Sequence, residues 1–284
     1  MFDNGLIKYY QTGYSADGVL NLKRFSRCQH LFKDGVLKLF ITPNCQYFSK
    51  TGTKEELDAE ILLSQVYARA GFDTTFYTPA IDTKDNQVVL SNSVASKGMV
   101  AQEFFNKVKS ENRGGFPWGF SYGSSVFSTL PDFMTKQGAR DVLKMTLFDV
   151  ASANFDRSKG NYIIKTSPEG KADGVVLYDY GASGVSSIAL STKSAPFYES
   201  EITYQNLFND YEGLTRNQIV REFKTNESAL SFISPVELAE SLGSVNPVEI
   251  ARDIKSEIGY QVEPEYADFI ASNYNNFAEQ LVQK

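Results

Sequence analysis

The spacing of apolar residues predicts strands in the first part of the chain. Short apolar runs at residues 19–22, 36–41 and 45–50 are each bounded by turn-forming residues, as the strands of hairpins are. A further run at residues 88–90 has the same character. We therefore expect the chain to be rich in strands up to about residue 95.

One helix interrupts these strands, at residues 54–70. Its apolar residues recur every three or four positions, which is the period of a helix with one buried face. Glu55 and Glu56 lie in the first turn, where the helix dipole favours negative charge, and Gly71 follows the last turn as a stop signal.

The pattern beyond residue 95 is mainly helical. We expect helices at residues 99–111 and 132–152, and two more that start at Pro235 and Pro247. Each proline follows a capping residue and precedes a glutamate in the first turn, which is typical of a helix start.

A pair of strands, at residues 162–164 and 175–178, lies in the middle of this helical part. The order of elements predicts an α+β fold, with a strand-rich part before residue 95 and a helix-rich part after it. Residues 112–128 are rich in glycine and aromatic residues, and we interpret them as an ordered loop.

Composition narrows the possible functions. The 284 residues carry a net charge of −6 and include 21 Phe and 16 Tyr, which argues against disorder and against general nucleic-acid binding. Two cysteines are too few for a disulfide scaffold. His30 is the only histidine, so histidine-based triads and multi-histidine zinc sites are excluded unless His30 takes part.

The N-terminal residues have no basic start followed by an apolar stretch, and no window approaches the roughly 20 apolar residues of a membrane helix. We therefore expect a cytoplasmic protein without a membrane segment.

Two segments next to the central strand pair carry candidate chemistry. Residues 154–161 read NFDRSKGN, and residues 178–181 read YDYG. Phosphoryl transfer needs a carboxylate near the attacking hydroxyl and hard oxygen ligands for Mg²⁺. Asp156, Asn161 and Asp179 could supply them.

The spacing of Asp156 and Asn161 is weak support by itself. It occurs three times, and the copies that begin at Asp149 and Asp268 lie in helical patterns. The spacing alone favours a capped turn at residues 154–161, because Asn, Asp, Ser and Gly favour turns. The following strand pair and the single Asp-Tyr-Gly sequence favour the chemical interpretation.

Residues 154–161 resemble the catalytic loop of HipA-like serine/threonine kinases, and residues 178–181 resemble their metal-binding segment. Phosphatidylinositol kinases use a similar pair of motifs. The resemblance implies a bilobal protein-kinase-like fold, with an N-lobe at residues 1–95 and a helical C-lobe at residues 96–284. It also implies that Asp156 is the catalytic base and that Asn161 and Asp179 bind Mg²⁺.

The resemblance extends upstream to the nucleotide site. Residues 46–51 resemble the strand that carries the nucleotide lysine, and the helix at 54–70 resembles the one that carries its glutamate. Lys50 would then bind the ATP phosphates while Glu60 holds it in an ion pair. Lys38, in the preceding strand, is the competing candidate, and both Lys50 and Glu60 could instead be ordinary surface residues.

The chain departs from the family at two points. Ser158 stands where the family has a histidine, which puts the orientation of the loop in doubt. The chain also lacks a glycine-rich phosphate loop before residue 36, where residues 26–30 are the best candidate.

We expect an ATP- and Mg²⁺-dependent kinase that acts on a serine or threonine of a protein. A pseudokinase or nucleotide-dependent interaction module is the main alternative. A lipid kinase is less supported, because no basic membrane-facing cluster accompanies the site. An adenylyl or glutamyl transferase on the same fold also remains open.

Overall fold

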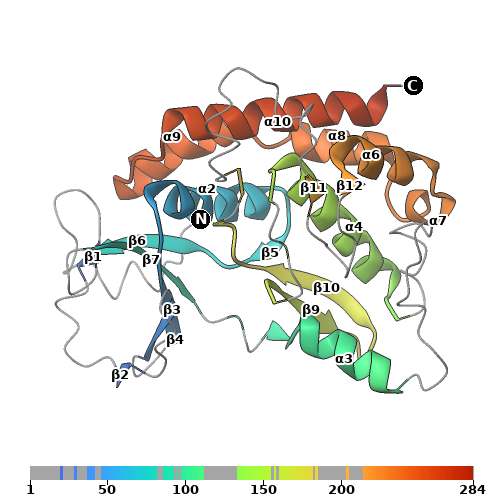
Figure 1. The fold of residues 1–284 in the computed structure, drawn as a ribbon, viewed down its shortest axis with the longest axis horizontal. Coiled ribbons are helices and arrows are strands. Elements are labelled where there is room, and N and C mark those ends of the chain that lie inside the picture. The colour runs from blue at the N-terminus through green and yellow to red at the C-terminus, as the bar shows by residue number, and fades with distance from the viewer. Residues whose placement is uncertain are drawn as a thin grey trace.

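The computed structural model describes residues 20–21, 29–30, 37–41, 46–81, 86–92, 94, 97–111, 133–154, 157, 160–181, 183–184, 203–204 and 214–283. These residues form a mixed α+β structure, which confirms the expected fold class (Figure 1).

The largest sheet has six strands in the order β1-β6-β7-β4-β3-β2. Its pairs are antiparallel except for β1 with β6, which is parallel. The strands are β1 Leu20–Asn21, β2 Gln29–His30, β3 Leu37–Ile41, β4 Gln46–Thr51, β6 Tyr77–Ile81 and β7 Gln87–Asn92.

A second sheet has four strands in the order β5-β10-β9-β8, and β11 pairs with β12 in a small third sheet. The strands are β5 Asp73–Thr74, β8 Met99–Val100, β9 Tyr162–Thr166, β10 Ala172–Leu177, β11 Thr203–Tyr204 and β12 Leu214–Thr215. Strand β5 runs parallel to β10, so the chain that leaves the first helix joins the sheet built by the central strand pair.

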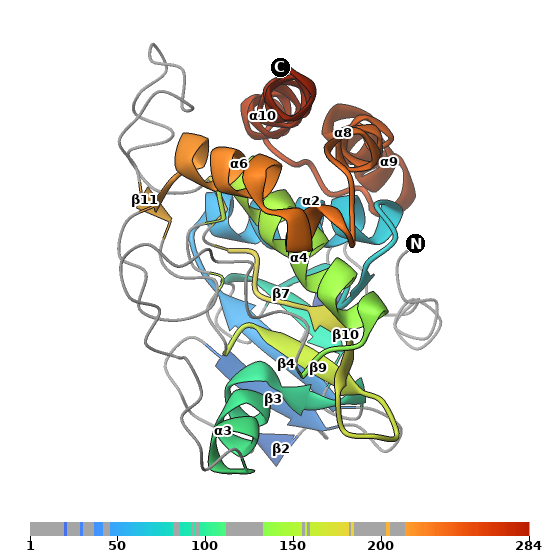
Figure 2. The ribbon, with the colours of Figure 1, turned by 90° about the vertical axis from the view of Figure 1, so that its right-hand side faces the viewer.

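Helices cover the sheets in two layers, with α2 and α4 against the strands and α8, α9 and α10 outside them (Figures 1 and 2). The helices are α2 Lys54–Arg69, α3 Ala101–Glu111, α4 Lys136–Ala151, α6 Arg216–Thr225, α7 Glu227–Leu230, α8 Pro235–Gly243, α9 Pro247–Ile258 and α10 Pro264–Val282. Because both of their sides meet other elements, α2 and α4 bury most of their residues.

Helix α2 begins where the sequence predicts, because side chains at its start form hydrogen bonds with the free backbone amides of its first turn. The Thr53 hydroxyl accepts a hydrogen bond from the Glu56 amide at 3.3 Å, and the Glu56 carboxylate accepts one from the Thr53 amide at 2.7 Å. This reciprocal pair is a capping box. The helix ends before Gly71, which has a φ of 89°.

The predicted starts of α8 and α9 are also confirmed. Ser234 and Asn246 are the N-caps, and each is followed by proline in the first turn. Helix α9 ends at Gly259, whose φ of 72° suits a residue without a side chain.

A buried carboxylate ties α2 to the C-terminal helices. Asp58 is fully buried and accepts hydrogen bonds from the Tyr260 hydroxyl at 2.7 Å and from the Glu263 amide at 3.0 Å. Lys54 pairs with the same carboxylate. The connection between α9 and α10 is therefore fixed to the first turns of α2.

The structure corrects the sequence prediction at two helix starts. Met99 and Val100 form strand β8, so the helix expected from residue 99 begins at Ala101. The helix expected from residue 132 begins at Lys136, because the Thr135 hydroxyl caps it by accepting from the Gly138 amide at 3.0 Å.

In the part of the chain that the structure describes, no helix has both the length and the apolar character needed to cross a membrane.

The capping box of α2 leads to a stability prediction. Thr53→Ala should lower the free energy of unfolding by about 1 kcal/mol, because it leaves the Glu56 amide without its partner. Urea denaturation followed by circular dichroism would measure the change. In the control Thr225→Ala, the lost hydroxyl bonds only carbonyls of its own helix, and the change should stay within about 0.5 kcal/mol. Equal effects of the two substitutions would contradict the role of the cap.

Candidate active site

Lys50 joins three segments that are distant in sequence. It lies near the end of β4, and its side chain is 22 % exposed. Its ammonium lies 2.5 Å from the Glu60 carboxylate on α2 and also pairs with the Asp179 carboxylate after β10. Burial alone lowers the pKa of Lys50, but the two carboxylates outweigh burial and hold this pKa above its usual value. Lys50 is therefore charged at neutral pH.

Glu60 is fully buried and depends on these partners. One carboxylate oxygen binds Lys50, and the other accepts a hydrogen bond from the Tyr180 amide at 2.8 Å. Burial raises the pKa of Glu60, whereas the charge of Lys50 opposes that rise. Glu60 is therefore not the ordinary surface residue that the sequence left open as an alternative.

Asp179 sits in an unusual backbone conformation. Its φ is 61°, in the left-handed region that a residue other than glycine seldom adopts. The Asp179 amide donates to the Tyr77 hydroxyl at 2.9 Å, which holds the turn in place. The turn directs the carboxylate of Asp179 to Lys50.

Gly181 leaves room for this cluster of charges. A Cβ at this position would lie 3.0 Å from the Lys50 ammonium and 3.1 Å from the Glu60 carboxylate. Side chains larger than hydrogen would therefore press on the ion pair. The glycine of the Asp-Tyr-Gly sequence is explained by this close approach.

Asn161 lies directly before β9, and its backbone is held close to that of Tyr178. The Arg157 guanidinium donates one hydrogen bond to the Asn161 carbonyl at 2.8 Å and another, from the same nitrogen, to the Tyr178 carbonyl. Tyr178 directly precedes Asp179. One nitrogen of Arg157 thus binds the backbone carbonyl of Asn161 and that of the residue before Asp179.

Asp156, the predicted base, lies outside the described residues, as do the neighbouring Ser158 and residues 26–28 of the predicted phosphate loop. Lys38 belongs to β3, but its side chain is also outside the described part. The structure therefore brings Lys50, Glu60 and Asp179 into contact and leaves the position of Asp156 as a prediction.

The protein residues at this site could supply only some of the oxygen ligands that a magnesium ion needs. Mg²⁺ commonly takes one or two carboxylates or other hard oxygens and completes its shell with water and phosphate. The Asp179 side chain is 34 % exposed and can offer an oxygen. Asn161 is the second ligand that the sequence predicts. Among the described residues, no three His, Cys, Asp or Glu side chains cluster as they would in a site made of protein alone.

Sequence reasoning missed the residues that support the site. Asp149 was set aside as part of a helix, yet its fully buried carboxylate binds Arg157 at 3.0 Å. Tyr77 was not considered for the site, and Tyr178 was included only as the first residue of the segment at residues 178–181. Their only signal was the position of Tyr178 next to Asp179, because their contacts join segments far apart in the chain.

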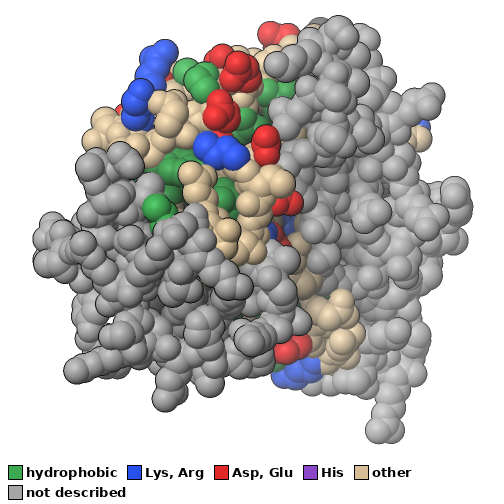
Figure 3. Space-filling view, turned by 60° about the vertical axis from the view of Figure 1, so that its left-hand side comes forward, with side chains coloured by type: hydrophobic (Ala, Val, Ile, Leu, Met, Phe, Trp, Pro, Cys, Tyr) green, Lys and Arg blue, Asp and Glu red, His purple; other side chains and the backbone are tan. Residues whose placement is uncertain are grey.

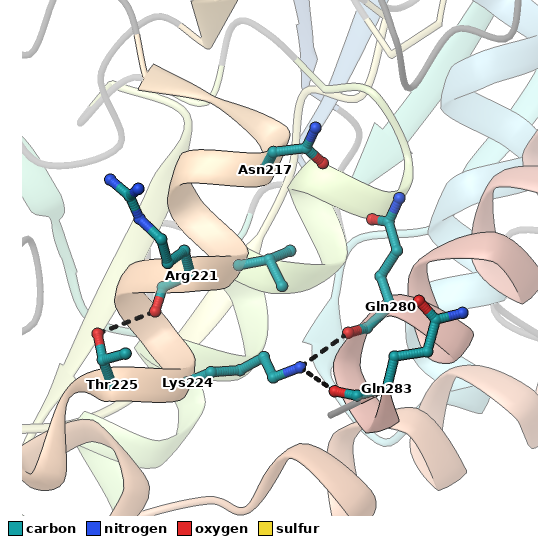
Figure 4. Close-up of a pocket in the computed structure, with 7 residues that line it drawn as sticks. Asn217, Arg221, Lys224, Thr225, Gln280 and Gln283 are labelled. Atoms are coloured by element: carbon teal, nitrogen blue, oxygen red, sulfur yellow. Dashed lines mark hydrogen bonds between the residues drawn. The ribbon is translucent and has the colours of Figure 1, made fainter.

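A separate cavity of about 460 Å³ lies between α6 and α10 (Figure 4). Its lining residues are Asn217, Val220, Arg221, Lys224, Thr225, Gln280 and Gln283. The ammonium of Lys224 points to the last carbonyls of α10, where it binds the Gln280 carbonyl at 3.2 Å. Lys50, Glu60, Asn161 and Asp179 are not among the residues that line this cavity.

Charges of both signs lie side by side on the face shown in Figure 3. The described part of this face therefore shows no continuous basic stripe of the kind typical of nucleic-acid-binding surfaces.

The ion pairs of Lys50 predict slow chemical modification. A succinimidyl ester reacts with the neutral amine, and Lys50 has both a raised pKa and a partly buried side chain. At pH 8, Lys50 should be acylated at least tenfold more slowly than the exposed Lys171, as measured by peptide mass spectrometry. Glu60→Gln should accelerate the reaction at Lys50 and leave Lys171 unchanged. Equal rates at both lysines in the wild-type protein would contradict the ion-pair assignment.

The sequence matches no family model and no curated protein. Among solved structures, the chain is similar to the Helicobacter pylori proinflammatory kinase CtkA, with a TM-score of 0.57 and 12 % identity over 90 % of this chain and 94 % of that one. It is also similar to HipA from Shewanella oneidensis MR-1, in a complex with HipB and operator DNA, with a TM-score of 0.45 and 12 % identity over 89 % of this chain and 64 % of that one. At that score the second likeness is too weak to support a conclusion.

At 12 % identity the first likeness concerns the fold and not the activity. It spans nearly the whole of both chains, and it agrees with what the motifs at residues 154–161 and 178–181 suggested. The resemblance predicted from the sequence is thus confirmed at the level of the fold, which the chain shares with the kinase CtkA.

Proposed function

We propose that the protein is an ATP- and Mg²⁺-dependent phosphotransferase that phosphorylates a serine or threonine of a protein. The observation that carries the proposal is the contact of Lys50 with both Glu60 and Asp179 in a chain with a kinase fold. Each of the three residues comes from a different segment, and each was selected from the sequence for its role in such a site.

Lys50 would supply the fixed positive charge that the phosphates of a nucleotide require. The pairing with Glu60 supports this role, because a lysine on a flexible stem needs a carboxylate to hold its ammonium in one place. Asp179 also forms an ion pair with Lys50, so a bound phosphate would have to replace Asp179 as the partner of the Lys50 ammonium.

Asp179 and Asn161 would hold the metal ion, which neutralises charge on the phosphates when it is bound. Asp156 would take the proton of the acceptor hydroxyl. Asp156 follows α4 in the sequence, and Arg157 next to it is anchored to α4 through Asp149.

The proposal includes two lobes, at residues 1–95 and 96–284, with the nucleotide between them. The contact between Lys50 on one side and Asp179 on the other agrees with such an arrangement. A protein acceptor is the partner that this proposal implies.

The test of the proposal is incubation with ATP and Mg²⁺, followed by intact-mass measurement of the protein and of candidate protein acceptors. Transfer of one phosphate would support the proposal. A mass gain of a whole nucleotide would instead indicate adenylylation, and nucleotide binding without transfer would indicate a pseudokinase.

Asp179→Ala separates metal-dependent from metal-independent binding. It should abolish the gain in ATP affinity that Mg²⁺ provides, because the substitution removes a carboxylate ligand. Affinity in the presence of a chelator should be retained or increased, since Lys50 loses a competing carboxylate. Isothermal titration calorimetry in both conditions would measure this. Asp268→Ala, at an exposed position on α10, is the control and should bind like the wild type. An undiminished effect of Mg²⁺ in Asp179→Ala would exclude Asp179 as a ligand.

Asp156→Asn should leave Mg²⁺·ATP affinity unchanged and lower the transfer rate by about a hundredfold or more, because the base acts on the acceptor and not on the nucleotide. A radiolabel transfer assay beside the calorimetry would show the difference. Asp268→Asn is a matched control, since it stands at the same spacing from Asn273 within α10. Full transfer activity in Asp156→Asn would mean that the base is another residue.

A further inference from the structure

The Arg157 side chain is fully buried and contacts three separate segments. Its Nε and Nη2 donate to the Asp149 carboxylate on α4 at 3.0 and 3.1 Å. Its Nη1 donates to the carbonyls of Asn161 and Tyr178. One planar group with fixed donor directions therefore joins α4, the start of β9 and the end of β10.

Tyr178 adds a second connection between the same two segments. Its hydroxyl donates to the Gly160 carbonyl, while its own carbonyl accepts from Arg157. Gly160 directly precedes Asn161, and Tyr178 directly precedes Asp179. The two hydrogen bonds thus hold together the residues next to both proposed metal ligands.

The Asp149 carboxylate is itself fixed from several sides. It accepts from the Tyr67 hydroxyl at 2.8 Å and from the Asn154 side-chain amide at 2.9 Å, as well as from Arg157. Tyr67 belongs to α2, the helix that carries Glu60. Arg157 is therefore oriented by a carboxylate that has little freedom to rotate.

We propose that Arg157, oriented by Asp149, and the hydroxyl of Tyr178 are positioning residues that set the separation between Asn161 and Asp179. This inference rests on the proposed function and adds to it the groups that adjust the site to a small cation. Mg²⁺ requires near-octahedral ligands at about 2.0–2.1 Å, whereas Ca²⁺ accepts longer and less regular ligand distances. A loosened connection between the two segments should therefore weaken Mg²⁺ more than Ca²⁺.

The deciding variant is Tyr178→Phe, which keeps the ring and removes only the hydroxyl. ATP affinity is measured by calorimetry with Mg²⁺, with Ca²⁺ and with a chelator. We expect about threefold to tenfold weaker binding with Mg²⁺, the range that one hydrogen bond provides, and a smaller change with Ca²⁺ or chelator. A purely structural role would change all three affinities together and leave the preference for Mg²⁺ unaltered.

Tyr260→Phe is the control, because it also removes a tyrosine hydroxyl that donates a hydrogen bond, in this case to the carboxylate of Asp58. Its preference for Mg²⁺ over Ca²⁺ should equal that of the wild type. Arg157→Lys keeps the charge but loses the planar fork, and it should shift the preference in the same direction as Tyr178→Phe. Circular dichroism establishes whether the lysine variant folds, and Tyr178→Phe decides the question if it does not.

The possible results distinguish a failure of this inference from a failure of the proposed function. A wild-type protein that binds no nucleotide with either cation would overturn the proposed function and this inference together. A wild-type protein that binds Mg²⁺·ATP, with the same preference for Mg²⁺ over Ca²⁺ in Tyr178→Phe, would overturn only the inference.

Discussion

The carboxylate of Glu60 has no access to solvent, and its need for partners brings distant parts of the chain together. A buried charge is costly unless it is paired and hydrogen-bonded. Glu60 meets that need with the ammonium of Lys50 from β4 and the backbone amide of Tyr180 from beyond β10. The six-stranded sheet, helix α2 and the segment after the central strand pair are therefore aligned by one side chain.

A second buried ion pair, between Arg157 and Asp149, also joins separate segments of the chain. The guanidinium of Arg157 and the carboxylate of Asp149 are both fully buried, and each makes further hydrogen bonds that offset the loss of water. The pair also fixes the arrangement of its neighbours, because Arg157 donates to the carbonyls of Asn161, directly before β9, and of Tyr178, directly before Asp179.

Local sequence signals predicted the elements that depend on local contacts. The capping residues, the apolar period of α2 and the turn-bounded strands all act within a few positions. Lys50, Glu60 and Asp179 were identified instead from short segments that resemble those of HipA-like kinases. Strands β5 and β6 escaped prediction because β5 has only two residues and β6 contains Pro79. Strand β5 is defined by its pairing with β10, far along the chain, and β6 by its antiparallel pairing with the next strand, β7. The contact between Arg157 and Asp149 escaped prediction because it forms only when the residues after α4 fold back onto that helix.

Helix α2 is fastened on opposite sides, which affects how the molecule can open. Asp58 and Glu60 are two positions apart and so point in directions that differ by roughly 200° around the helix. Asp58 binds the connection between α9 and α10, and Glu60 binds Lys50 and Tyr180. A rotation of α2 that released one carboxylate would disturb the other. Amide hydrogen exchange near the site and at the junction of the last two helices should thus occur through one shared, cooperative opening rather than through independent local fluctuations.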